Sequence, residues 1–182
     1  MATTKVAIIG CGRIAGHHCR AIQATEGVEL VSVCDLVREK AEAYKDEFGV
    51  KAYLSYDEML IENPEINTVA VVTPSGMHFE HVLDIIKRYN KNIIIEKPTF
   101  MQPSQVEKAY RQASEAGVKI FAVFQNRHNK AVQRVYQGLN SGELGKLRAV
   151  GVRVRWCRPQ RYYDLAPWRG TFALDGGCLT NQ

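Results

Sequence analysis

The chain has 182 residues, of which 46% are hydrophobic and 24% are charged, and its formal net charge is +5. This composition supports a folded core and excludes a disordered chain. No run approaches the roughly 18 apolar residues that a membrane span needs, and the first five residues lead straight into a strand-like run without a signal peptide. We therefore expect a cytoplasmic protein with no membrane partner, whose positive charge suits an anionic ligand.

The cysteines indicate neither a disulfide framework nor a metal site. There are five of them, an odd number, and no Cys-x-x-Cys pair occurs. We expect reduced thiols and no bound metal. They are Cys11, Cys19, Cys34, Cys157 and Cys178.

Short apolar runs alternate with amphipathic stretches through the first 124 residues. The expected strands are Lys5–Ile9, Val28–Cys34, Lys51–Tyr53, Thr68–Val72, Asn92–Ile95 and Lys119–Phe124. The expected helices are Arg13–Thr25, Leu36–Phe48, Tyr56–Glu62, Met77–Tyr89 and Pro103–Ala116. Strands that are apolar on both faces and alternate with helices predict an α/β fold with a doubly wound parallel sheet.

The pattern changes after about residue 124. A helix is expected over Lys130–Leu139 and a turn over Gly142–Gly145, and the alternation of valine and arginine over Leu147–Trp156 predicts a strand with one solvated face. Six arginines and several aromatic residues lie between residues 148 and 169. We interpret residues 1–124 as one domain, and residues 125–182 as the beginning of an incomplete α+β domain for substrate binding and oligomerisation.

A glycine-rich turn joins the first expected strand to the first helix, in the sequence Gly10-Cys11-Gly12-Arg13-Ile14-Ala15. Gly10 permits a tight turn, and Gly12 lets the backbone approach a pyrophosphate at the helix N-terminus. Asp35 ends the second strand about 20 residues later, where a carboxylate accepts ribose hydroxyls. These features predict a Rossmann domain that binds NAD, because Asp35 repels the 2′-phosphate of NADP.

Two further motifs follow the fourth and fifth main strands, at the carboxyl edge of the sheet where ligands bind. They are Thr73-Pro74-Ser75-Gly76-Met77-His78 and Glu96-Lys97-Pro98. Together with the glycine-rich turn, they make the chain resemble the Gfo/Idh/MocA oxidoreductases over essentially its whole length.

The resemblance implies specific roles. Lys97 is the expected catalytic residue, at the nicotinamide and the substrate, and the bond before Pro98 is expected to be cis. His78 is expected to pack or cap near the cofactor. The expected cofactor-binding residues are Gly10, Gly12, Arg13, Ile14, Asp35, Thr73, Pro74, Ser75, His78, Glu96, Lys97 and Gln125.

Later segments are similar to a nucleotide-sugar branch of that family, whose members oxidise the 3-hydroxyl of a UDP-N-acetyl-amino-uronate for bacterial surface polysaccharide such as lipopolysaccharide. These segments are residues 124–129, 155–163, 167–170 and 175–182. Arginine suits the pyrophosphate and carboxylate of such a substrate. The expected substrate-binding residues are Lys97, Arg127, Arg158, Tyr163, Trp168 and Asn181.

One departure affects the expected chemistry. The family pattern has an Asp-x-x-x-His pair, but Asn181 stands at the Asp position and the His falls three residues beyond Gln182. The resemblance implies hydride transfer from a sugar carbon to NAD, with Lys97 orienting the hydroxyl and the His accepting its proton. It also implies a homo-oligomer for full-length members.

Alternatives remain open at this point. The chain is either part of an NAD-dependent dehydrogenase or a non-catalytic NAD-binding module. If it is part of a dehydrogenase, the substrate is the nucleotide sugar named above or another sugar or cyclitol. A nucleic-acid partner is not expected, because no nucleic-acid-binding motif accompanies the basic residues.

Overall fold

The computed structural model describes residues 3–181, apart from the side chains of residues 178 and 179. The chain forms two compact units: residues 1–123 together with 170–182, and residues 124–169. The domain boundary expected after residue 124 stays a prediction.

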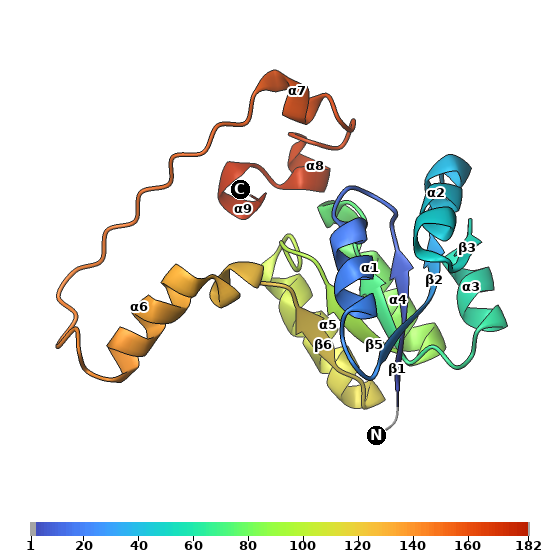
Figure 1. Ribbon diagram of the computed structural model, residues 1–182, viewed down its shortest axis with the longest axis horizontal. Coiled ribbons are helices and arrows are strands. Elements are labelled where there is room, and N and C mark those ends of the chain that lie inside the picture. The colour runs from blue at the N-terminus through green and yellow to red at the C-terminus, as the bar shows by residue number, and fades with distance from the viewer. Residues whose placement is uncertain (1–2, 182) are drawn as a thin grey trace. The chain divides into compact units, whose positions relative to one another are not determined.

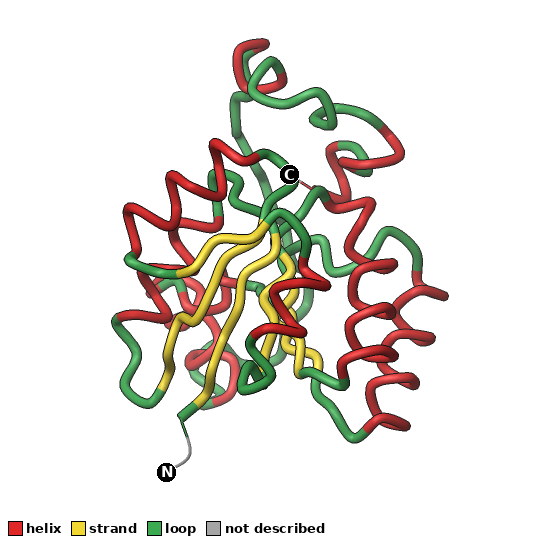
Figure 2. The backbone as a smooth tube through the Cα atoms, turned by 90° about the vertical axis from the view of Figure 1, so that its right-hand side faces the viewer, coloured by secondary structure: helices red, strands yellow, loops and turns green. Residues whose placement is uncertain are grey.

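The first unit contains a six-stranded parallel sheet in the order β3-β2-β1-β4-β5-β6 (Figures 1 and 2). Its strands are β1 (Thr4–Ile9), β2 (Val28–Cys34), β3 (Lys51–Tyr53), β4 (Thr68–Val71), β5 (Asn92–Ile95) and β6 (Ile120–Ala122). This is the strand order of the doubly wound dinucleotide-binding fold. The predicted fold class is confirmed.

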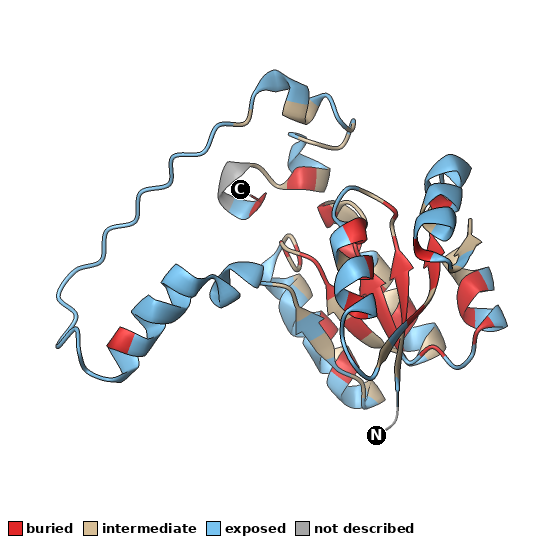
Figure 3. Ribbon diagram, viewed as in Figure 1, coloured by how far each residue is buried: buried red, intermediate tan, exposed pale blue. Residues whose placement is uncertain are grey.

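Helices cover both faces of this sheet. They are α1 (Ala15–Gln23), α2 (Arg38–Phe48), α3 (Tyr56–Glu62), α4 (His78–Tyr89) and α5 (Pro103–Ala116), with a 3-10 turn η1 (Ser75–Met77) before α4. Because successive strand side chains point to opposite faces, β1 contributes to two cores. Ala7 packs with residues of α3, α4 and α5, whereas Ile8 packs with residues of α1 and α2. The strands of this sheet are largely buried (Figure 3).

Local sequence signals explain several helix boundaries. The Ser55 hydroxyl accepts from the backbone N–H of Asp57, which caps α3. The side chains of Gln102 and Gln105 form a capping box at the start of α5. Gly49 ends α2 in the left-handed conformation, with φ +68°.

Residues 170–181, which we call the tail, follow the second unit in sequence and belong to the first unit. The tail contains α8 (Phe172–Asp175) and α9 (Cys178–Asn181). Helix α8 packs on η1 so closely that a methyl group at Gly76 would strike the backbone of Ala173 and Leu174. The tail therefore lies at the edge of the sheet from which α4 begins.

The second unit contains η2 (Gln125–His128), α6 (Lys130–Asn140) and α7 (Gln160–Tyr163). The predicted strand over residues 147–156 is wrong, because this segment pairs with no described strand (Figure 1). Val150, Val152 and Val154 are 71–84% exposed. An alternating sequence becomes a strand only when a partner satisfies its backbone groups, and the described part of the chain supplies none.

Among residues 3–181, no helix combines the length and apolar character needed to span a bilayer.

Candidate cofactor and substrate site

Four strands of the first unit end side by side. In the sheet register, Ile9 of β1 is level with Cys34 of β2 and with Val71 of β4, and Val71 is level with Ile95 of β5. The parallel arrangement therefore brings the segments that follow these strands to one edge, where ligands bind in such sheets. Those segments begin with Gly10, Asp35, Val72 and Glu96.

The glycine-rich turn has space on one side only. Gly10 has φ +99°, and a Cβ there would lie 2.9 Å from the carbonyl oxygen of Val72, so Gly10 permits close packing of the turn against β4. A Cβ at Gly12 would meet nothing within 4 Å. Ile14 precedes α1 without a side-chain cap, and the N–H groups of Ala15 and His17 donate to the carbonyl oxygens of Gly12 and Ile14 within the first turn. This geometry fits a pyrophosphate.

Asp35 connects two loops through its carboxylate. Its Oδ2 accepts the backbone N–H of Cys11 and its Oδ1 accepts that of Val37, both at 2.8 Å. The carboxylate is thereby fixed at the end of β2, beside the glycine-rich turn. Each carboxylate oxygen has capacity for a second hydrogen bond, so the arrangement fits a pair of ribose hydroxyls.

His78 joins the loop after β4 to the loop after β5. Its Nδ1 lies 2.9 Å from the carbonyl oxygen of Pro98, and its Nε2 lies 2.9 Å from that of Thr73. The side chain is 1% exposed. Burial lowers the pKa of His78, and the two carbonyl contacts offset part of this effect. The ring therefore connects the two loops inside the protein.

The loop after β5 carries the Glu96-Lys97-Pro98 motif. The Lys97–Pro98 peptide bond is cis, which confirms the prediction. Glu96 Oε1 lies 2.9 Å from His18 Nε2, and Glu96 Oε2 accepts the backbone N–H of Lys97 at 2.9 Å. Burial favours a higher pKa for Glu96, but these two hydrogen bonds and the electrostatic attraction of His18 and Lys97 together hold the pKa below its ordinary value. Glu96 is therefore an ionised anchor for the loop.

The Lys97 ammonium group contacts the tail. It donates to the carbonyl oxygen of Asn181 at 2.6 Å and to the Oδ1 of Asn181 at 2.8 Å. The Asn181 amide donates in turn to Asp175 Oδ1, while Asp175 Oδ2 accepts the backbone N–H of Gly170 at 2.7 Å. Asp175 and Asn181 are both buried. A network of hydrogen bonds from the tail thus holds Lys97 at the carboxyl edge of the sheet.

The second unit gathers arginines against aromatic rings. The Arg158 guanidinium lies 4.3 Å from the ring centroid of Trp156 and 4.6 Å from that of Tyr162. Arg169 lies 4.5 Å from Tyr162 and 4.8 Å from Trp168. Each of these guanidinium groups therefore lies against two aromatic rings.

The predicted site residues fall into two groups. Those in the first unit share its carboxyl edge: Gly10, Gly12, Arg13, Ile14, Asp35, Thr73, Pro74, Ser75, His78, Glu96, Lys97 and Asn181. Those in the second unit are Gln125, Arg127, Arg158, Tyr163 and Trp168. Gln125 and Arg127 lie on η2 and are exposed, and the Tyr163 ring packs edge-on against Tyr162 with centroids 5.2 Å apart.

Sequence reasoning missed His18. None of the sequence motifs includes His18, but His18 contacts Glu96 and its side chain is 14% exposed. The two residues are 78 positions apart. No local pattern signals such a pair, because the fold alone brings α1 and the loop after β5 together.

Comparisons with known proteins agree with this geometry. Residues 4–124 match the GFO_IDH_MocA profile, described as an oxidoreductase family with an NAD-binding Rossmann fold. A scyllo-inositol 2-dehydrogenase (NAD(+)) of Bacillus subtilis is 27% identical over 143 residues, which cover 78% of this chain and 42% of that protein.

Two solved structures are similar over the whole chain. One is the WlbA dehydrogenase from Bordetella pertussis in complex with NADH and UDP-GlcNAcA, at 34% identity and a TM-score of 0.93. The other is the Chromobacterium violaceum WlbA dehydrogenase with the same two ligands, at 32% identity and a TM-score of 0.93. Each match covers 100% of this chain and 52% of the other chain, so this chain spans about half the length of these relatives. The chain belongs to the Gfo/Idh/MocA oxidoreductase family, and its residues 4–124 are the NAD-binding Rossmann domain of that family.

Proposed function

We propose that this chain supplies the cofactor site and the reactive lysine of an NAD-dependent dehydrogenase that oxidises the 3-hydroxyl of a UDP-N-acetyl-amino-uronate. The carrying observation is the position of Lys97, which lies at the carboxyl edge of the Rossmann sheet and is held there by Asn181. The similarity to two dehydrogenases solved with NADH and UDP-GlcNAcA supports this substrate class.

The residues at the sheet edge fit the dinucleotide. The open side of Gly12 and the uncapped start of α1 suit the pyrophosphate, and the Asp35 carboxylate suits the ribose hydroxyls. When bound, NAD supplies a hydride acceptor. An ammonium group has three N–H donors, and Asn181 accepts two of those of Lys97. The third orients the substrate hydroxyl and stabilises negative charge on its oxygen.

The choice of NAD over NADP is part of the proposal. A 2′-phosphate placed at Asp35 would face a carboxylate whose oxygens already accept two backbone N–H groups. Fluorescence titration of the purified chain should therefore give tighter binding of NADH than of NADPH, and Asp35→Ala should weaken NADH binding. Tighter NADPH binding, or no effect of Asp35→Ala, would contradict the assignment.

The substrate is tested by NADH absorbance with a full-length protein that contains this chain. UDP-N-acetylglucosaminuronic acid should be oxidised, while UDP-N-acetylglucosamine, which lacks the carboxylate, should react much more slowly. Lys97→Met should remove turnover and leave NADH binding within a few-fold of the wild type. Faster oxidation of myo-inositol would replace the proposed substrate with a cyclitol.

The 182-residue chain alone is expected to bind NAD⁺ without appreciable turnover. The resemblance places a proton-accepting His beyond residue 182, and a positioned general base contributes about 10²–10⁴ in rate. Equal turnover by the short chain and a full-length protein would show that Lys97 and its neighbours suffice.

A further inference from the structure

A tyrosine on the second helix contacts the glycine-rich turn. Tyr44 of α2 donates its hydroxyl hydrogen to the carbonyl oxygen of Gly12 at 2.7 Å, across 32 positions of sequence. The Tyr44 side chain is half-buried. The dinucleotide fingerprint contains no residue from this helix, so its motif does not account for the contact.

The hydroxyl lies within the first turn of α1. In a regular α-helix, the N–H of Gly16 would donate to the carbonyl of Gly12. Here the Gly12 carbonyl oxygen accepts the backbone N–H of Ala15 at 3.0 Å as well as the Tyr44 hydroxyl, so the hydroxyl joins α2 to the turn that opens α1. Burial raises the pKa of Tyr44, and the contact with Gly16 reverses this only in part, so the hydroxyl keeps its proton at neutral pH.

The Tyr44 contact sets the direction of a neighbouring N–H group. In a planar trans peptide, the carbonyl and the following N–H point in opposite directions. Because the Gly12 carbonyl points to Tyr44 on α2, the N–H of Arg13 points away from α2. A Cβ at Gly12 would meet no atom within 4 Å, so the turn has an open side.

Contacts between α1 and α2 hold the tyrosine in place. Its ring packs against Phe48 with centroids 5.5 Å apart. Arg20 of α1 lies 5.9 Å from the Phe48 ring centroid and pairs with Glu47 at 2.9 Å. The hydroxyl is therefore presented to the turn by a packed side chain.

We propose that Tyr44 is a positioning residue for pyrophosphate binding: its hydroxyl fixes the Gly12–Arg13 peptide so that the N–H of Arg13 faces the phosphate oxygens. The inference rests on the proposed NAD site. It adds α2 to the elements that determine cofactor affinity, without contact between Tyr44 and the cofactor.

The test is the affinity of Tyr44→Phe for ligands with and without a pyrophosphate. NADH binding by fluorescence and ADP binding by calorimetry should both weaken about 3- to 10-fold, the range of one hydrogen bond. Adenosine, measured by NMR titration, should bind as it does to the wild type. Unchanged NADH affinity, or an equal loss for adenosine, would overturn the proposal.

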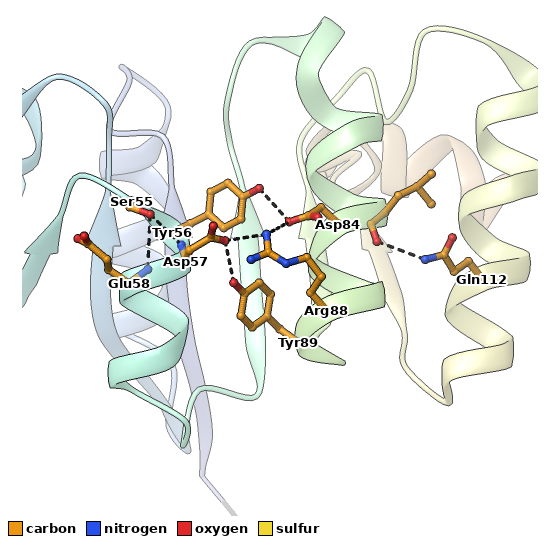
Figure 4. A network of polar contacts seen from close by, with 9 residues as sticks. Ser55, Tyr56, Asp57, Glu58, Asp84, Arg88, Tyr89 and Gln112 are labelled. Atoms are coloured by element: carbon orange, nitrogen blue, oxygen red, sulfur yellow. Dashed lines mark hydrogen bonds and ion pairs between the residues drawn. The ribbon is translucent and has the colours of Figure 1, made fainter.

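Tyr56→Phe is the matched control. The Tyr56 hydroxyl donates to Asp84 at 2.9 Å on the surface between α3 and α4, in a network with Arg88 (Figure 4). This variant also loses one tyrosine hydrogen bond, but its NADH affinity should not change. Both variants are compared at a temperature where circular dichroism shows them folded. No NADH binding by the wild type would overturn the NAD site together with this inference, whereas normal binding by Tyr44→Phe would overturn this inference alone.

Discussion

His18 Nε2 lies 2.9 Å from Glu96 Oε1, so the first helix of the Rossmann unit is connected directly to the loop that carries Lys97. Both side chains are largely buried, at 14% and 11% exposure. The helix whose N-terminus faces the proposed pyrophosphate site therefore also supports Lys97, the proposed reactive residue. A displacement of α1 moves both parts of the site.

The Glu96 contact predicts a pH-dependent contribution to stability. Burial favours a higher pKa for Glu96, but the hydrogen bonds from His18 and from the Lys97 backbone, with the electrostatic attraction of His18 and Lys97, hold its pKa in the folded protein below the ordinary value of 4.5. The stabilisation is therefore fully present above pH 4.5 and is lost as the pH falls through the lower folded pKa.

Urea unfolding of the wild type and Glu96→Gln measures this contribution. The stability difference between the two proteins should be largest at neutral pH and should shrink in acid. A difference that stays constant across this range would show that the carboxylate charge contributes nothing.

His78→Ala should destabilise the protein strongly. The substitution leaves the carbonyl groups of Pro98 and Thr73 without their ring contacts and opens a cavity. An unsatisfied buried polar group costs about 1–3 kcal/mol, and each kcal/mol lowers Tm by about 2–4 °C in a protein of this size. Thermal unfolding should show a fall in Tm of at least about 5 °C, with a smaller fall for His78→Asn. His128→Ala, an exposed change on η2, should have little effect.

Gly76→Ala should detach the tail from the Rossmann unit. The new methyl group would strike the backbone of Ala173, which cannot move as a flexible side chain does. Hydrogen exchange of residues 170–181 should accelerate in the variant. Gly151→Ala, at a position with open space around its Cβ, should leave this exchange unchanged. Unchanged protection in Gly76→Ala would show that the backbone accommodates the methyl group.

Asn181→Asp should destabilise the tail at neutral pH. The amide of Asn181 donates to the buried carboxylate of Asp175, so the substitution brings two carboxylates together. Attraction from Lys97 offsets only part of the repulsion, because Lys97 is less buried than the two carboxylates would be.

Melting temperatures at neutral and acidic pH test this expectation. The deficit of Asn181→Asp should shrink in acid, where one carboxylate takes up a proton and donates to the other. Adding Asp175→Asn should restore stability at neutral pH, because the amide donor and the carboxylate acceptor then exchange positions. A double variant as unstable as the single one would refute the electrostatic explanation.

Local patterns accounted for most of the Rossmann fold. Mainly apolar runs, such as Val28–Cys34, and helices with clear end signals, such as Pro103–Ala116, have the predicted boundaries. Helix α1 begins at Ala15 and not at Arg13, because the first residues after Gly12 form a turn. Periodicity reports which side chains share a face, and it does not report where such a turn passes into a helix.

The motifs predict which residues gather at the carboxyl edge of the sheet, but they do not show how these residues are held in place. The contacts of Glu96 with His18 and of Gly12 with Tyr44 join residues 78 and 32 positions apart. These pairs depend on the packing of whole elements, so no spacing in the sequence marks them. The prediction of a strand over residues 147–156 was wrong for a related reason. Alternating polarity is a property of one segment, whereas a β-strand needs a second strand to pair with.

The buried thiol of Cys11 lies within the glycine-rich turn, so its chemical reactivity reports the opening of that turn. Burial, with a smaller effect of the Asp35 carboxylate, raises the pKa of Cys11 to about 12, and the side chain is 4% exposed. Alkylating reagents act on the thiolate, so Cys11 reacts only when the turn opens to solvent. The rate of Cys11 alkylation, followed by mass spectrometric mapping, therefore reports how often the nucleotide-binding turn opens. A bound dinucleotide lowers this alkylation rate.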